Sequence, residues 1–210
     1  MIQIIQESEN NSALIAAKHL KKGGIVAFAT DTVYGFGVSA SDSVAVDRLY
    51  ELKKRDSKKA VAVLLRSFDR AQELLCFNEA SIKISKKFLP GPLTIILPIK
   101  GDNKKLSKNL NLMDSSIGFR VVDQDFINRL FSEFDGDIAL SSANVSQESV
   151  FKSGREIYES FYETKLDLLV VDSGELNDNL ASTIVKVDND KLEILREGII
   201  SKETINNETS

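Results

Sequence analysis

The sequence contains very little cysteine and histidine, and this scarcity removes several kinds of catalytic and metal site. Among its 210 residues, Cys76 is the single cysteine and His19 the single histidine. One cysteine can form neither an internal disulfide nor a cysteine metal cage. One histidine gives little support to a Ser-His-Asp or Cys-His mechanism, or to a histidine-rich zinc site. The chemistry that remains is catalysis by positioning and by positive charge.

Long apolar runs are also lacking. No run reaches the length of about 18 residues that a membrane-spanning helix needs. The start, Met1-Ile2-Gln3-Ile4-Ile5, has neither the basic segment nor the small-residue cleavage site of a signal peptide. We therefore expect a soluble, cytoplasmic protein with no membrane partner.

The composition favours one domain with one core. Apolar residues make up 42% of the chain and charged residues 28%, which suits a single domain over residues 1–198. Residues 199–210 are polar enough to predict a loose C-terminal tail. The net charge of −4 argues against a surface built to hold a long polyanion, although it permits a local basic cleft. A small anion is the expected partner.

Apolar and amphipathic segments alternate along the chain, which is typical of a mixed α/β domain. Short apolar runs predict buried strands, and near-helical spacing of apolar residues predicts helices between them. The expected strands are 25–29, 60–65, 93–97, 117–121, 138–140, 168–171 and 182–187, the last turning through 188–190 into 192–195. The expected helices are 13–20, 42–54, 67–75, 78–88 and 124–134.

One loop and one basic cluster suggest an anion-binding cleft. The polar segment Thr30-Asp31-Thr32-Val33-Tyr34-Gly35 directly follows an apolar strand, and Lys53-Lys54-Arg55 with Lys58-Lys59 follow about one helix later. By themselves these residues indicate a phosphate or carboxylate ligand. A solvated run at a helix end, or a patch that touches tRNA, is the alternative interpretation of the basic cluster.

Further motifs fall at strand ends, where open α/β sheets tend to bind ligands. Each alone has an ordinary explanation as a turn, a helix cap or a surface ion pair. Their order along the chain is more specific. The motifs are Pro90-Gly91-Pro92-Leu93-Thr94, Phe119-Arg120-Val121, Ser142-Ala143-Asn144, Val171-Asp172-Ser173-Gly174, Ser182-Thr183-Ile184-Val185 and Leu195-Arg196-Glu197-Gly198.

Together with Thr30–Gly35 and Lys53-x-Arg55, this ordered set resembles the YrdC family over about residues 25–198. The resemblance implies a YrdC-like twisted mixed sheet flanked by helices, with a central cationic cleft. Members with the Ser-Ala-Asn segment are threonylcarbamoyl-AMP synthases, here of the single-domain type. Such enzymes make threonylcarbamoyl-adenylate and pyrophosphate from L-threonine, bicarbonate and ATP. Other tRNA-modification proteins then use the adenylate.

The resemblance also implies a role for individual residues. Thr30, Thr32, Arg120 and Ser182 would bind threonine, with Arg120 on its carboxylate. The residues expected to bind ATP are Lys53, Arg55, Lys59, Ser116, Ser142, Asn144 and Arg196, and Lys53 and Arg55 would also act in catalysis. A Mg²⁺ ion would arrive with ATP, held by phosphates and water and by no protein ligand.

The chain departs from the family pattern at several positions. Lys54 stands where glycine is common, so the loop is expected to follow a different path or to be more mobile. Leu64 stands where longer members have histidine, and it cannot donate a hydrogen bond to threonine.

Other functions remain open at this level. A YciO-like paralogue would share the fold with different or weaker activity. An RNA-binding module, or weak tRNA binding beside the enzyme activity, would show strong salt dependence. A carbamoyl-transferring domain of hydrogenase maturation would normally belong to a much longer chain.

Overall fold

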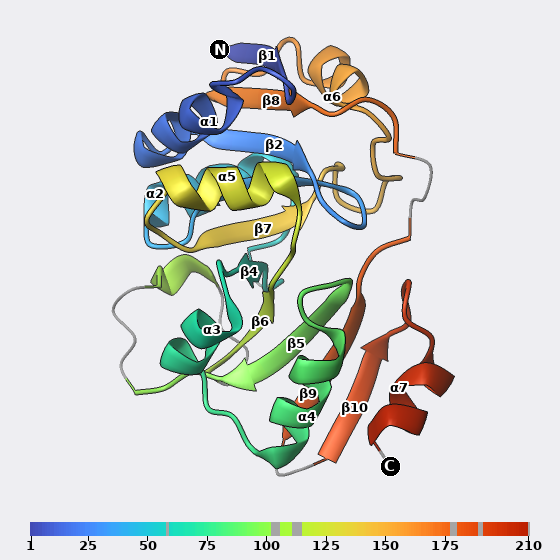
Figure 1. Ribbon diagram of the computed structural model, residues 1–210. Coiled ribbons are helices and arrows are strands. Elements are labelled where there is room, and N and C mark those ends of the chain that lie inside the picture. Colours follow the sequence, from blue (N-terminus) through green and yellow to red (C-terminus); the bar gives the residue numbers. More distant parts are fainter. Residues whose placement is uncertain (58, 102–105, 111–114, 177–179, 189–190, 210) are drawn as a thin grey trace.

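The computed structural model describes residues 1–57, 59–101, 106–110, 115–176, 180–188 and 191–209 (Figure 1). Lys58 of the basic cluster, and Asn189 and Asp190 of the expected turn, lie outside these residues. The strands are β1 (Ile2–Gln6), β2 (Ile25–Ala29), β3 (Tyr34–Ser39), β4 (Ala62–Leu64), β5 (Leu93–Pro98), β6 (Ser116–Arg120), β7 (Ile138–Ser142), β8 (Leu168–Asp172), β9 (Thr183–Asp188) and β10 (Lys191–Arg196). The helices are α1 (Ser12–Lys21), α2 (Ser43–Leu52), α3 (Phe68–Leu74), α4 (Glu79–Phe88), α5 (Asp125–Glu133), α6 (Gly154–Ser160) and α7 (Lys202–Thr209), with a 3₁₀ turn at Lys108–Leu110.

All these strands belong to one mixed sheet with the order β1-β8-β2-β3-β7-β4-β6-β5-β9-β10. β1, β8 and β2 are parallel to one another, whereas β3 is antiparallel to both of its neighbours, β2 and β7. Figure 1 shows β1 and the N-terminus at one end of the molecule, and β10 and the C-terminus at the other. The expected α/β fold, a twisted mixed sheet flanked by helices, is therefore confirmed.

Strand β2 explains why the sheet needs helices on both faces. All five residues of Ile25–Ala29 are buried, because alternate side chains enter two separate apolar clusters. Val26 and Phe28 pack in the cluster that contains apolar residues of α1 and α5. Ile25 and Ala27 face the other cluster, to which α2 contributes Val46 and other residues. Figure 1 shows α1 and α5 together on one face of this part of the sheet.

The C-terminal residues form a helix, which corrects the expectation of a loose tail over 199–210. Helix α7 packs beside α4, and Ile205 is fully buried in the core between them. An ion pair of 2.9 Å joins Lys87 of α4 to Glu208. One apolar side chain in a polar segment gave no periodic signal, so the sequence did not indicate this helix.

Two further strands, β1 and β3, and helix α6 were not expected from the sequence. β3 contains Gly35 and Gly37, which are uncommon in strands, yet added Cβ atoms there would lie 2.7 Å from the Leu140 side chain and 2.8 Å from that of Phe28. Helix α6 begins at Gly154 and has only seven residues. None of the helices in the described part of the chain has the length and apolar character needed to span a membrane.

Candidate functional site

A polar cavity of about 170 Å³ opens where several strands end. The turn between β2 and β3 forms one wall, and the C-terminal residues of β6, β7 and β10 reach it from other parts of the sheet. Its lining residues are Thr30, Thr32, Val33, Tyr34, Gly35, Arg55, Ala60, Val61, Ala62, Thr94, Arg120, Leu140, Ser141, Ser142, Ala181, Ser182, Ile184 and Arg196. Distant parts of the sequence therefore converge on one hydroxyl- and guanidinium-rich site.

The turn after β2 is held by its own threonine. Thr30 Oγ1 donates a hydrogen bond to the carbonyl of Val33 at 2.7 Å and accepts from the backbone N–H of Thr32 at 3.2 Å. The hydroxyls of Thr30 and Thr32 are also within 2.9 Å of each other. Both side chains are buried. This arrangement fixes two hydroxyl groups at the cavity wall.

Arg120, the last residue of β6, has few partners for a buried cation. It is 5% exposed; one terminal nitrogen donates to Thr32 Oγ1 at 3.1 Å and the other pairs with Asp31 Oδ1. Its Nε and the second Asp31 oxygen are buried with no hydrogen-bond partner. Burial lowers the pKa of Arg120, and the nearby charge of Asp31 opposes that effect. The site thus holds a buried guanidinium whose hydrogen-bonding capacity is only partly used.

Ser182 links the far wall to a second guanidinium. Its hydroxyl lies 2.9 Å from Thr94 Oγ1, and its carbonyl accepts from Arg196 Nε at 3.2 Å and from a terminal nitrogen of Arg196 at 2.8 Å. The pKa of Arg196 is lowered first by burial and then by the charge of Arg120. Two cations therefore share one cavity, a condition that favours an anionic ligand.

Arg55 and Lys53 are two residues apart in the sequence, but their side chains lie in different places. Arg55 lines the cavity and donates to the carbonyl of Ala60 at 2.9 Å. Lys53 is 1% exposed and points instead toward the segment after β7, where its ammonium contacts Ser142 and Asn144. Burial lowers the pKa of Lys53 to about 7, and the charge of Arg55 contributes to the shift.

The structure brings together most of the residues predicted to bind substrates. Seven of them line the cavity: Thr30, Thr32, Arg55, Arg120, Ser142, Ser182 and Arg196. Lys53, Lys59, Ser116 and Asn144 do not belong to the lining.

Ser116 lies at the other end of β6 from the cavity. It begins β6, paired with Pro98, whereas Arg120 ends the same strand. A strand advances roughly 3.3 Å per residue, so the two ends are about 13 Å apart. The predicted role of Ser116 in ATP binding therefore stays a prediction.

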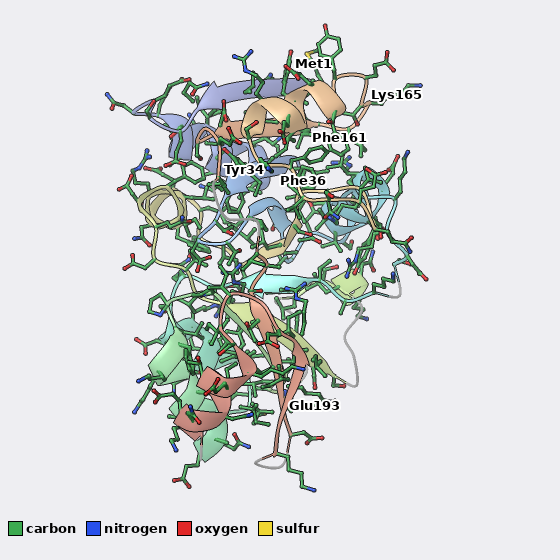
Figure 2. The ribbon with its side chains drawn as sticks, turned by 90° about the vertical axis from the view of Figure 1, so that its right-hand side faces the viewer. Met1, Tyr34, Phe36, Phe161, Lys165 and Glu193 are labelled. Atoms are coloured by element: carbon green, nitrogen blue, oxygen red, sulfur yellow. The ribbon has the colours of Figure 1, made fainter. Side chains whose placement is uncertain are left out.

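Sequence reasoning missed several residues of the site. Asp31 and Tyr34 belong to the polar loop singled out above but were given no role. The Tyr34 hydroxyl accepts from the N–H of Ser173 and donates to the carbonyl of Gly174, both at 2.8 Å. It thereby fixes the loop to the chain that leaves β8. Figure 2 shows Tyr34 close to Phe36, the second residue after it on β3. Thr94 ends a motif that was read as a turn, and its contact with Ser182 could not be seen from spacing.

Metal-ligating side chains do not cluster in the described part of the chain, where no group of three histidine, cysteine, aspartate or glutamate residues could hold an ion. The cavity lining offers hydroxyl groups and three arginines and contains no carboxylate side chain. Such a donor set does not suit a bound divalent cation.

The fold is that of a mixed α/β protein, and a cavity lined by hydroxyls and arginines is typical of a site for an anionic ligand. Comparison with known proteins then gives the family. A model of the Sua5/YciO/YrdC family, described as telomere recombination, matches residues 18–198, and the chain belongs to this family.

Relatives match over most of this chain. One from Methanocaldococcus jannaschii is 32% identical over 93% of this chain and 90% of its own length. The human threonylcarbamoyl-AMP synthase is 32% identical over 81% of this chain, which spans 61% of the human protein. The structure of Pyrococcus abyssi Sua5 complexed with L-threonine superposes with a TM-score of 0.87 at 29% identity, covering 99% of this chain and 60% of that one.

Proposed function

We propose that this protein is a threonylcarbamoyl-AMP synthase, an ATP-dependent nucleotidyltransferase. Its substrates would be L-threonine, bicarbonate and ATP carried with Mg²⁺, and its products threonylcarbamoyl-adenylate and pyrophosphate. The observation that carries the proposal is Arg120, a buried and only partly bonded guanidinium beside the Thr30 and Thr32 hydroxyls. The relatives named above, one of them bound to L-threonine, support the same reading.

The cavity suits the amino acid better than the nucleotide. At about 170 Å³ it is smaller than the roughly 300 to 1,000 Å³ typical of ligand pockets. In the proposed complex, threonine fills the cavity with its carboxylate on Arg120. Its hydroxyl meets the Thr30 and Thr32 hydroxyls, which allows the site to reject valine. The nucleotide then extends across the rim, with its phosphates near Arg55 and Arg196.

The proposed reaction needs no side-chain nucleophile. The threonine nitrogen bonds to the bicarbonate carbon, with loss of water, and leaves a carbamate. A carbamate oxygen then bonds to the α-phosphorus of ATP while the bond from that phosphorus to the bridging oxygen breaks, and pyrophosphate leaves. Holding three reactants in one cleft is worth up to about 7 to 11 kcal/mol in well-oriented systems. Guanidinium groups stabilise the charge that develops on the leaving group.

In this account the ion enters with its substrate. Mg²⁺ would stay on the phosphates of ATP and on water, as expected for an ion that retains much of its hydration. The adenylate would pass to the proteins that install threonylcarbamoyl on tRNA, in the cytoplasm.

The test is an omission assay on the purified protein. ATP, Mg²⁺, bicarbonate and L-threonine are incubated together, and each is left out in turn while pyrophosphate is measured. The proposal predicts pyrophosphate only when threonine and bicarbonate are both present. A folded protein that binds ATP but releases no pyrophosphate would overturn it and favour the YciO-like alternative.

A further inference from the structure

The buried ammonium of Lys53 uses all of its hydrogen-bonding capacity inside the protein. An ammonium has three N–H donors and no acceptor. In the structure Lys53 Nζ contacts the carbonyl of Ser142, the carbonyl of Asn144 at 2.8 Å and Asn144 Oδ1 at 2.9 Å. Three donors meet three oxygens, so a phosphate oxygen could be bound only by giving up one of these contacts.

Asn144 is equally engaged. Its Oδ1 also accepts from Ser142 Oγ at 2.7 Å, and its amide nitrogen donates to the carbonyls of Val145 at 2.9 Å and Glu148 at 2.8 Å. Neither Asn144 nor Lys53 lines the cavity, whereas Ser141 and Ser142 do. The amide therefore holds the segment together and does not face a ligand.

The two residues form a clasp that ties the end of α2 to the segment after β7. The backbone N–H of Ser146 donates to the carbonyl of Lys53 at 2.8 Å, which adds a main-chain link to those of the ammonium. The ammonium also lies 5.8 Å from the centre of the Phe36 ring, which is labelled in Figure 2. Phe36 in turn packs edge-to-face against Phe161, with ring centres 5.4 Å apart (Figure 2). Backbone carbonyls, the Asn144 side chain and the Phe36 ring therefore surround the Lys53 ammonium.

We propose that Lys53 is a positioning residue, which shapes the Ser142–Asn144 segment for the nucleotide and does not itself contact phosphate. Burying a cation is costly unless hydrogen bonds offset the loss of water, and the three oxygens supply that compensation. The benefit is a fixed path for the backbone that carries Ser141 and Ser142 to the cavity wall. The proposal rests on the proposed function, because it assumes that a nucleotide binds beside this wall.

The first test compares nucleotides that differ in phosphate number. Lys53→Met removes the donors while keeping a long apolar chain, and the affinities of AMP, ATP and L-threonine are measured for the full protein. A positioning role predicts the same loss of about tenfold for AMP and ATP, with threonine affinity retained. A loss that grows from AMP to ATP, or an equal loss of threonine affinity, would overturn the proposal.

Lys59→Met is the matched comparison, because Lys59 lies in the same loop and is exposed. If Lys59 meets the phosphates, its variant shows the phosphate-dependent loss that Lys53→Met is expected to lack. Wild-type protein that binds neither AMP nor ATP would instead contradict the nucleotide part of the proposed function, so the two failures are distinguishable.

The second test is a double-mutant cycle with Asn144→Ala. If Lys53 acts through Asn144, the double variant has the same affinity for AMP as the single variant of lower affinity. The reason is that the clasp can be lost only once. Independent phosphate and base contacts would give additive losses and overturn the proposal. If Lys53→Met does not fold, Asn144→Ala breaks the same clasp from its other end, and it must show the same phosphate-independent loss.

Discussion

At the scale of single residues, Arg120 is a buried cation in the site with an unpaired hydrogen-bond donor. Its guanidinium is buried, its Nε lacks a partner, and the carboxylate of Asp31 bonds it through one oxygen only. A substrate carboxylate would supply acceptors for donors of Arg120 that the protein itself leaves unpaired, which gives a physical reason for binding there.

Arg120→Lys tests this role, because lysine keeps the positive charge and removes the planar fork. We expect the affinity for L-threonine to fall by about 1.5 to 3 kcal/mol, the value of a charge-assisted hydrogen bond, while ATP affinity changes little. Calorimetric titration with each ligand measures both. Equal losses for the two ligands would remove the carboxylate assignment.

Residue types and their order predicted which strands carry the site, but not the direction of every side chain. The seven correctly grouped residues lie at strand ends or in loops where the ordered motifs placed them. Lys53 and Arg55 are two positions apart, yet only Arg55 reaches the cavity. That difference arises from how the chain leaves α2, since Lys53 caps the helix and Lys54 has a φ of 47°. Spacing alone contains no such information.

At the scale of elements, the end of α2 shows how the chain replaces a common glycine. Lys54 adopts the left-handed backbone that glycine enters at little cost, so the loop has a conformation typical of glycine despite the substitution. A side chain in this region costs roughly 1 to 2 kcal/mol.

Lys54→Gly is therefore expected to stabilise the protein by about 1 kcal/mol, after allowance for the greater freedom of glycine in the unfolded chain. Lys54→Ala is the control, because it removes the long side chain but keeps the Cβ atom. Urea unfolding measures both variants. If the glycine variant is no more stable than the alanine variant, backbone strain is not the cause.

Gly198 controls how closely the end of β10 approaches the cavity wall. A Cβ atom there would lie 2.1 Å from the carbonyl oxygen of Ala181 and 2.6 Å from the carbonyl carbon of Ser182. These are backbone atoms, so the two segments must separate.

We expect Gly198→Ala to destabilise the protein by about 1 to 3 kcal/mol and to weaken threonine binding, because Ser182 and Arg196 lose their register. Leu195→Ala, at an exposed neighbour, should stay within about 0.5 kcal/mol. Urea unfolding and threonine titration are the measurements. Unchanged binding would show that this contact does not position Ser182.

The sequence predicted the elements with continuous apolar runs or clear helical periodicity. β2, β5 and β6 were found within a residue or two, and so were the capped helices α3 and α4. β3 was missed because its glycines resemble a loop, and α7 because its single apolar residue, Ile205, gives no helical periodicity. Both are stabilised by contacts distant in the sequence, with β7 in one case and α4 in the other.

At the scale of the whole molecule, the cavity joins distant strands of the sheet. Thr30 and Thr32 follow β2, whereas Ser182 precedes β9, and Figure 1 shows these strands far apart in the sheet. A ligand that contacts both walls links parts of the fold that are separate along the chain and across the sheet.

Ligand binding should therefore raise the stability of the entire domain. L-threonine at about one hundred times its dissociation constant is expected to raise the free energy of unfolding by about 2.7 kcal/mol. A thermal unfolding scan detects the shift, and the same concentration should stabilise the Arg120→Lys variant by only about 0.3 to 1.3 kcal/mol, less than half as much. Equal shifts in both proteins would place threonine outside this cavity.

The proposed function requires that the protein join threonine, bicarbonate and the nucleotide in one product. Its most direct test is the mass of the adenylate formed from ATP, L-threonine and carbon-13 bicarbonate. We expect one carbon-13 atom in the threonylcarbamoyl-adenylate, so that its mass exceeds that of the product made with ordinary bicarbonate by the difference between carbon-13 and carbon-12. An adenylate with no label, or threonyl-adenylate without the added carbon, would contradict it.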